Sequence, residues 1–415
     1  MKKTIYKLIA VIMVLALIAA CTTQEKAPAP AAPAADSGAP SEPVTTDDKQ
    51  EAEDASSEVV APSGEPIVLG MVTEMQKEYS YYVRDGVQMA LDEINAAGGV
   101  LGRPLEIVME DEGPDQQGSI NAMMKLLSQD HIVGILGSIQ SPYCVAAVDL
   151  VDQAKVPTLM GGSSRKIVEL GSDYIYLVRT IDKYNGANVA KLAAEVYNAE
   201  RVAIVHMNDA SGVSYSEAIA QTLIDKYGIT PVLTLGYDEK TETNFNPYII
   251  QVLNADADFM FFSGGTGPQI LMQQASWNNG FEGKVFCSTP GVSAQAVEMS
   301  GEAANGWSAV SDYCSNTTDP TQLAFVEKYR KDHEFDPDFF AAEYYDIVYI
   351  FKEAIELAGK ADRESINQGI KMIKNLQGAM SNYSFHEDHG LSNLVYVVTV
   401  IDGVPTVEDI VYTYE

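Results

Sequence analysis

From Ile67 onward the sequence alternates short β-rich runs with amphipathic stretches. Ile67–Val72 has the composition of a strand, and Val83–Ala97 carries apolar residues at helical spacing until Gly98-Gly99 ends the pattern. The expected strands of this first run are Ile67–Val72, Leu105–Glu110, Ile132–Gly137 and Pro157–Met160, and the expected helices are Val83–Ala97, Gln116–Gln129 and Tyr143–Gln153.

The same pattern restarts after Tyr174–Arg179. The expected helices of the second run are Gly186–Tyr197, Tyr215–Tyr227, Asn246–Leu253 and Gln269–Asn278, and the expected strands are Val202–His206, Thr230–Leu235, Phe259–Phe262 and Lys284–Cys287. Two successive runs of strand–helix units predict an α/β protein with two parallel sheets, each flanked by helices and packed as a separate lobe. Residues 320–374 are expected to be mostly helical, and Tyr383–Tyr414 to form strands with a turn at Glu387–Gly390.

The N-terminal residues predict export and membrane anchoring. Lysines 2, 3 and 7 precede an apolar run from Leu8 to Ala20, which is too short to span a bilayer and is typical of a signal peptide, residues 1–20. The ending Ile18-Ala19-Ala20-Cys21 resembles a bacterial lipobox, which implies cleavage before Cys21 and a lipid on its sulfur. We therefore expect an exported protein, anchored through Cys21 on the outer face of the cytoplasmic membrane or on the periplasmic side.

Residues 21–65 are expected to form a disordered linker behind the lipidated Cys21. This stretch is rich in Ala, Pro, Ser and acidic residues, and almost no large apolar side chain is present to offset the entropy of ordering. A Pro-rich, self-repelling segment of this kind acts as an extended spacer that lifts a domain off the lipid surface.

The part expected to fold is strongly acidic. The whole chain has a net charge of −31, and residues 66–415 keep −26 of it once the three leader lysines and the linker's −8 are removed. Such a domain does not bind nucleic acid or an anionic membrane face through charge. Cys144, Cys287 and Cys314 have no C-x-x-C spacing, so redox and zinc chemistry are not expected, and an odd number leaves at most one disulfide plus a free thiol.

Parallel sheets bind ligands at the carboxyl ends of their strands. The loops expected at those ends are rich in Ser, Gly and Thr and poor in bases. Hydroxyls and N–H groups at helix starts can hold a carboxylate or amide oxygen, although the same residue types also cap helices and make turns. These loops are Thr73–Tyr82, Ser138–Pro142, Gly161–Arg165, Asn208–Gly212, Ser263–Gly267 and Ser288–Ser293.

The run Asp85–Ser138, which includes GGVLGRPLEIVMEDE, resembles the periplasmic leucine/isoleucine/valine-binding proteins of ABC importers. The resemblance continues through AVDLVDQAKVPTLMGGSS and RVAIVHMNDASG to about Tyr412. It implies a two-lobed periplasmic-binding-protein type I fold, no catalysis, and three hinge crossings near Thr180, Asp312 and Gly390. The implied lobes are residues 66–180 with 313–390, and residues 181–312 with 391–415.

A comparison by position with that family divides the implied site into two halves. The half that holds a ligand carboxylate is kept as Ser138 and the pair Ser163-Ser164. Tyrosines of the second lobe are replaced by Ser211 and about Thr266, which leaves room for a bulkier ligand. The candidate ligand-binding residues are Tyr79, which matches an aromatic that packs on the ligand, Ser138, Ser163, Ser164, Ser211, Thr266, Pro290 and Tyr345.

The half that holds a ligand ammonium is changed, because the family's glutamate falls on Pro290. Either another acid serves the ammonium group or the ligand has none. The candidate replacements are Asp209, Asp312, Glu343 and Glu74. Amino acids, including aromatic or larger ones, and small organic acids both remain open as ligands.

Other chemistries have weaker support. His386-Glu387-Asp388-His389 looks metal-like, but a solvated turn is the better interpretation. No nucleophile elbow, metalloprotease, P-loop or dinucleotide motif is present. We expect a monomeric solute-binding lipoprotein, without metal or cofactor, that delivers a small molecule to an ABC permease. A ligand-sensing lipoprotein is the alternative, and an extracellular hydrolase has no nucleophile–base pair to support it.

Overall fold

A computed structural model describes residues 61–385, 389–391 and 394–412. These residues belong to one compact unit, Glu58–Glu415. The predicted signal peptide, the lipidation site Cys21 and nearly all of the predicted linker lie outside the described residues. In the described part of the chain, no helix has both the length and the apolar character needed to cross a membrane.

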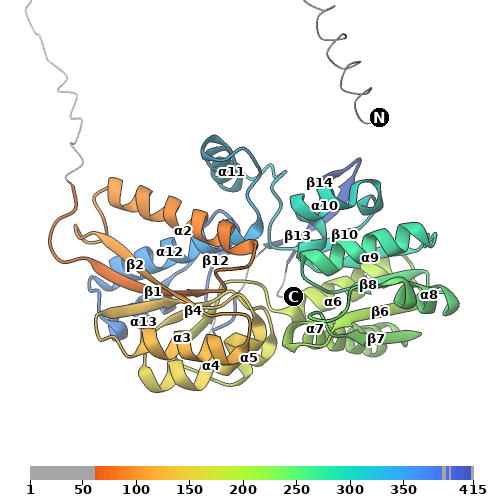
Figure 1. Ribbon diagram of the computed structural model, residues 1–415, viewed down its shortest axis with the longest axis horizontal. Helices are drawn as coiled ribbons and strands as arrows, with labels where there is room; N and C mark the ends of the chain where they lie inside the picture. The colour runs from red at the N-terminus through yellow and green to blue at the C-terminus, as the bar shows by residue number, and fades with distance from the viewer. Residues whose placement is uncertain (1–60, 386–388, 392–393, 413–415) are drawn as a thin grey trace, which may run out of the picture. The chain divides into compact units, whose positions relative to one another are not determined.

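The first sheet is parallel throughout, with strand order β2-β1-β3-β4-β5. Its strands are β1 (Ile67–Thr73), β2 (Leu105–Asp111), β3 (Ile132–Leu136), β4 (Thr158–Met160) and β5 (Ile175–Leu177). Its helices are α2 (Tyr79–Ala96), α3 (Gln116–Leu127), α4 (Ser141–Ala154), α5 (Arg165–Glu169), α12 (Phe339–Ala358) and α13 (Arg363–Met372). One apolar core joins the sheet to α2, α12 and α13, and a second joins its other face to α3 and α4 (Figure 1).

The second sheet has strand order β14-β13-β10-β9-β8-β6-β7. Its strands are β6 (Val202–Met207), β7 (Leu233–Tyr237), β8 (Phe259–Phe262), β9 (Lys284–Cys287), β10 (Ser308–Ser311), β13 (Leu394–Ile401) and β14 (Val404–Tyr412). Strands β6 to β10 pair in parallel, and the β13–β14 hairpin adds antiparallel to β10.

Helices cover both faces of the second sheet as well. They are α6 (Asp182–Lys191), which continues into the π-helical turn η1 (Leu192–Val196), α7 (Ala210–Thr222), which continues into η2 (Leu223–Tyr227), α8 (Asn246–Asn254), α9 (Thr266–Asn278) and α10 (Ala294–Ser300). One apolar core joins α6 and α7 to one face of the sheet, and another joins α8, α9 and α10 to the opposite face. Helix α11 (Pro320–Asp332) packs with the start of α12, and β11 (Leu376–Gln377) pairs with β12 (Asn382–Tyr383).

The chain passes between the two sheets three times: after β5, after β10 and before β13. This arrangement confirms the predicted α/β fold with two sheets. The residues at which the lobes divide, and the action of the crossings as hinges, stay predictions.

Most predicted strands and helices match the observed ones to within a few residues, but some short elements were missed. Strand β10 and helices α5 and α10 were missed, because four residues reading SAVS, five reading RKIVE and seven reading AQAVEMS are too short to show periodicity. Part of the predicted turn Glu387–Gly390, residues 387 and 388, lies outside the described residues. Phe385 and Leu391, on either side of this turn, form an antiparallel bridge. The β13–β14 hairpin has a turn of its own at Asp402-Gly403, both at positive φ (51° and 76°), as a two-residue hairpin turn requires.

Candidate ligand-binding site

The carboxyl ends of the two sheets contact each other through polar loops. The loop that follows β4 carries Ser163 and Ser164, and Ala210 and Ser211 begin α7, the helix that follows β6. The Ser164 hydroxyl donates to the Ala210 carbonyl oxygen at 2.9 Å, and the Ser163 and Ser211 hydroxyl oxygens are 3.5 Å apart. Three of the predicted site residues therefore lie together, in the place where parallel sheets bind ligands.

Two further contacts join the same edges. Arg165 at the start of α5 forms an ion pair with Glu217 on α7 at 2.6 Å. Lys240, which follows β7, donates to the carbonyl oxygen of Pro114, which follows β2, at 3.2 Å. The segments that follow the strands of the two sheets thus contact each other directly at both of these points as well as through the serines.

Ser138 is buried at the end of β3 and already has a partner within the chain. Its hydroxyl donates to Glu112 Oε1 at 2.9 Å and accepts from the Gln140 N–H at 3.0 Å. The other oxygen of Glu112 accepts from Ser119 at 3.0 Å. Burial raises the pKa of Glu112 to about 7, although both hydroxyls lower it. A hydroxyl has one proton to donate, so Ser138 can meet a ligand carboxylate only by releasing Glu112.

Ser211 is held by a second buried acid. Its hydroxyl donates to Asp182 Oδ2 at 2.8 Å, at the first residue of α6. Burial raises the pKa of Asp182 to about 7, against hydrogen bonds from Ser163 and Ser211 that lower it. Glu112 and Asp182 were missed in the sequence. Glu112 could have been recognised as an acid that comes directly after a predicted strand. The sequence around Asp182 did not distinguish it from an aspartate that caps a helix.

The remaining predicted residues lie at other loops of the same edges. Tyr79 begins α2, where its hydroxyl donates to Glu74 at 3.3 Å and its ring packs against Phe340 at 5.2 Å between centroids. Half-buried Thr266 begins α9, next to Gly265, whose N–H donates to Glu239 at 2.7 Å. Among the described residues, no hydrogen bond joins Tyr79 or Thr266 to the three serines.

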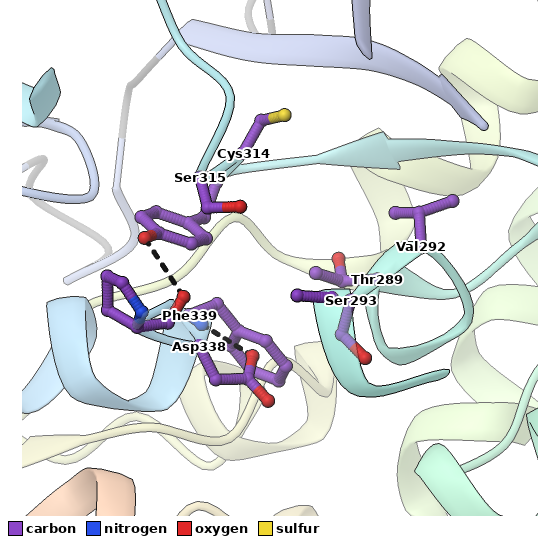
Figure 2. Close-up of a pocket in the computed structure, with 10 residues that line it drawn as sticks. Thr289, Val292, Ser293, Cys314, Ser315, Asp338 and Phe339 are labelled. Atoms are coloured by element: carbon purple, nitrogen blue, oxygen red, sulfur yellow. Dashed lines mark hydrogen bonds between the residues drawn. The ribbon is translucent and has the colours of Figure 1, made fainter. Parts of the chain in front are cut away.

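Pro290 lies in η3 (Thr289–Val292), the one-turn helix after β9, and its carbonyl accepts from Ser293 at 2.8 Å. This turn borders a small hollow of about 20 Å³, room for a water molecule (Figure 2). The opposite wall is formed by the start of α12, where Asp338 caps the helix by accepting from the Phe339 N–H. Residues Tyr313–Ser315, after β10, complete the lining.

Beside this hollow an ion pair joins two of the three crossing segments. Arg179, after β5, donates to both carboxylate oxygens of Asp312, after β10, at 3.0 and 2.9 Å. The guanidinium also lies 4.7 Å from the centre of the Phe339 ring. The Asp312 side chain is fully buried and that of Arg179 is 13% exposed, so this pair is desolvated.

The four acids considered as replacements for the missing glutamate have different surroundings. Asp209 caps α7 by accepting from the Gly212 N–H at 2.7 Å. Asp312 pairs with Arg179, and Glu74 accepts from Tyr79. Glu343 is fully buried, and neither of its carboxylate oxygens has a hydrogen-bond partner.

Tyr345 lies away from the three serines. Its hydroxyl donates to Glu93 on α2 at 2.8 Å and its ring packs on Phe325, so the structure does not bring it to the serines. Successive residues of a helix point about 100° apart, and it is the preceding Tyr344 whose hydroxyl donates to the Gly137 carbonyl, next to Ser138.

Two other sequence interpretations can be compared with the structure. The solvated-turn interpretation is wrong for His389, which is buried and stacks on the Tyr176 ring at 4.4 Å between centroids. Its Nδ1 forms a hydrogen bond with the Ile175 carbonyl oxygen. Residues 386–388 lie outside the described part of the chain. Cys144, Cys287 and Cys314 are all free and buried. Within the described residues, no group of His, Cys, Asp and Glu side chains could hold a metal ion.

Two β-sheets, each flanked by helices, with polar loops that meet at the carboxyl ends of their strands, define the two-lobed class of binding proteins. A sequence profile of the periplasmic binding protein family matches residues 66–404, so the chain belongs to that family. It is a solute-binding protein rather than an enzyme.

The chain is similar to curated binding proteins over most of its folded part. A leucine-, isoleucine-, valine-, threonine- and alanine-binding protein of Pseudomonas aeruginosa is 25% identical over 333 residues, which cover 79% of this chain and 87% of that protein. The leucine-specific-binding protein of Salmonella typhimurium is 25% identical over 299 residues, which cover 71% of this chain and 77% of the relative.

Solved structures share the fold. A leucine-binding protein from Thermotoga maritima superposes with a TM-score of 0.76 at 22% identity and covers 83% of this chain and 98% of its own. A solute-binding protein of an ABC transporter from Rhodopseudomonas palustris, in complex with p-hydroxybenzoic acid, gives 0.77 at 22% identity and covers 84% of this chain and 98% of its own.

Proposed function

We propose that this protein is an extracytoplasmic solute-binding lipoprotein of an ABC importer, and that it captures a small amino acid-like or carboxylate ligand between its two lobes. The observation that carries the proposal is the contact between loops of the two sheets, in which Ser163 and Ser164 meet Ala210 and Ser211. A ligand that contacts both loops favours the closed state by its differential free energy.

The ligand class is supported by the relatives, whose names state amino acids and, in one structure, p-hydroxybenzoic acid. The site itself offers hydroxyl donors and helix N-termini, which suit an anionic or carbonyl oxygen. The lipid anchor at Cys21 and the permease partner rest on the sequence predictions. The alternative function is a ligand-sensing lipoprotein, and transport of the ligand would distinguish the two.

A ligand panel tests the proposal. The full chain, solubilised in detergent, is heated with single amino acids, amides and small organic acids, and a ligand present at 100 times its Kd stabilises the fold by about 2.7 kcal/mol. We expect at least one compound of these classes to raise the melting temperature, and cells that lack the protein to lose uptake of that compound. If the compound binds but its uptake is unchanged, the sensing alternative replaces the importer; if no compound binds, the proposed ligand classes are wrong.

A further inference from the structure

Glu343 is a buried acid that the fold itself leaves without a partner. It lies in the second turn of α12 and is 0% exposed, and neither Oε1 nor Oε2 accepts a hydrogen bond. The other buried carboxylates described above all have donors: Ser119 and Ser138 for Glu112, Ser211 for Asp182, and Arg179 for Asp312. Burying a carboxylate without a hydrogen-bond donor is costly, so packing alone does not account for an acid at this position.

The Glu343 carboxylate lies at the base of the serine loops. A Cβ atom placed on Gly161 would be 2.6 Å from Glu343 Oε1, 3.0 Å from Ile139 Cγ2 and 3.2 Å from Ile139 Cα. Gly161 begins the loop that carries Ser163 and Ser164, and Ile139 follows Ser138. Glycine at position 161 therefore lets the backbone of the serine loop approach the carboxylate closely, with the Ile139 side chain as the other neighbour at this point.

The charges around this position favour a cation. The charges of Arg179, Asp312, Asp338 and Asp346 shift the pKa of Glu343. The charge of Glu343 in turn raises the pKa of Tyr344, Cys144 and Tyr383. The single cation in this set, Arg179, is already bound through both nitrogens by Asp312. Carboxylates are thus in excess over cations here, and the buried acids Glu112 and Asp182 increase that excess.

We propose that the ligand carries an ammonium group and that Glu343 is the carboxylate that receives it. The inference rests on the proposed function, because it assumes a small ligand between the serine loops. Asp209, Asp312 and Glu74 are committed to partners within the chain, which leaves Glu343 as the replacement for the acid missing at Pro290. A charge-assisted bond to a buried carboxylate selects strongly against an analogue that lacks the donor.

Matched pairs of compounds test the ammonium requirement. Leucine with 4-methylpentanoate, and phenylalanine with 3-phenylpropanoate, differ only in the amine. Calorimetry on the full chain should find the amine-bearing member of a pair bound at least tenfold more tightly. Equal affinity within a pair, or a panel in which no amine-bearing compound binds, contradicts the inference. If only the deaminated acids bind, the proposed function stands and this inference alone fails; if nothing binds, both fail.

Glu343→Gln tests the residue, with Glu353→Gln on the same helix as the matched control. Glu343→Gln should weaken the amine-bearing ligand at least tenfold, while Glu353→Gln changes its affinity less than twofold. The unliganded melting temperature should stay equal or rise in Glu343→Gln, because an unpartnered acid is removed. Unchanged affinity in Glu343→Gln contradicts the assignment.

Proton release tests the same bond in the unaltered protein. Burial holds the pKa of Glu343 well above its usual range, which favours the protonated form, whereas an adjacent ammonium favours the carboxylate. Binding at pH 7 should therefore release a proton, measured as binding heats that vary with the ionisation enthalpy of the buffer. The release should be smaller in Glu343→Gln, which leaves only the exchange of other buried acids such as Glu112 and Asp182. Heats that do not depend on the buffer contradict the assignment.

Discussion

The ion pair between Arg179 and Asp312 allows a quantitative prediction about what holds the crossing segments together. Asp312→Ala removes both acceptors of a guanidinium whose side chain is only 13% exposed. Breaking a buried pair by removing one partner leaves an uncompensated charge and costs about 3–5 kcal/mol. We therefore expect Asp312→Ala to lower the free energy of unfolding by about that amount.

The chain provides a matched control for this prediction. Arg330 binds Asp336 through the same two-bond geometry, at 2.6 and 2.9 Å, but with side chains that are 43% and 35% exposed. Because solvent screens an exposed pair, Asp336→Ala should cost only about 0–1 kcal/mol. Burial, rather than hydrogen-bond geometry, is then the variable that separates the two variants.

Urea unfolding followed by tryptophan fluorescence measures both variants. The midpoint should fall much further in Asp312→Ala than in Asp336→Ala, with similar slopes. Replacing both partners, Arg179→Met with Asp312→Leu, should recover most of the loss, because no buried charge is then left alone. If Asp312→Ala and Asp336→Ala differ by less than about 1 kcal/mol, the desolvation argument is wrong.

Four further predictions concern other parts of the chain. Cys21→Ser should abolish partition into detergent, and a variant that stays membrane-bound after salt washing would contradict lipidation at this residue. Gly86→Ala should destabilise the fold by about 1–3 kcal/mol, because the new Cβ would lie 2.1 Å from the Ala341 carbonyl oxygen where α2 meets α12. The control in the same urea assay is Gly267→Ala, whose new Cβ would have no atom within 4 Å. Ser164→Ala removes the bond to Ala210 and should weaken ligand binding by about 1 kcal/mol in calorimetry, whereas unchanged affinity would place the ligand elsewhere. Glu112 has a raised pKa of about 7 in the folded state against a usual 4.5, so the folded state binds more protons between those two pH values. The free energy of unfolding should therefore fall as the pH rises from about 4.5 to about 7. Glu112→Gln should make that fall shallower, and an identical slope would contradict the raised pKa.

The sequence predicted the sheets better than the site. Strands such as Phe259–Phe262 and Lys284–Cys287 were predicted with their observed bounds, because a run of buried apolar residues is a local signal. Strand β10 was missed because its pairing with β9 and β13 depends on residues far away in the chain. Local patterns specify which segments extend, and tertiary contacts decide whether a short polar segment joins a sheet.

The site residues show the same division. The Ser-rich loops were located from their place after the strands, and Ser163, Ser164 and Ser211 do lie together. The partners of these hydroxyls could not be predicted, since Glu112 lies 26 positions from Ser138 and Asp182 lies 29 from Ser211. Tyr344 and Tyr345 are adjacent in sequence, and only the packing of α12 decides which of them faces the Ser138 loop.

Closure of the two lobes on the ligand is the central claim, and a distance between spin labels tests it most directly. Met124 on α3 and Ile224 in η2 are exposed and flank different sheets, and the cysteines at 144, 287 and 314 are buried away from a labelling reagent. With labels at these two positions, double electron–electron resonance should give a broad set of distances without ligand and a single shorter distance with it. A ligand that binds and leaves the distances unchanged would contradict closure between the lobes.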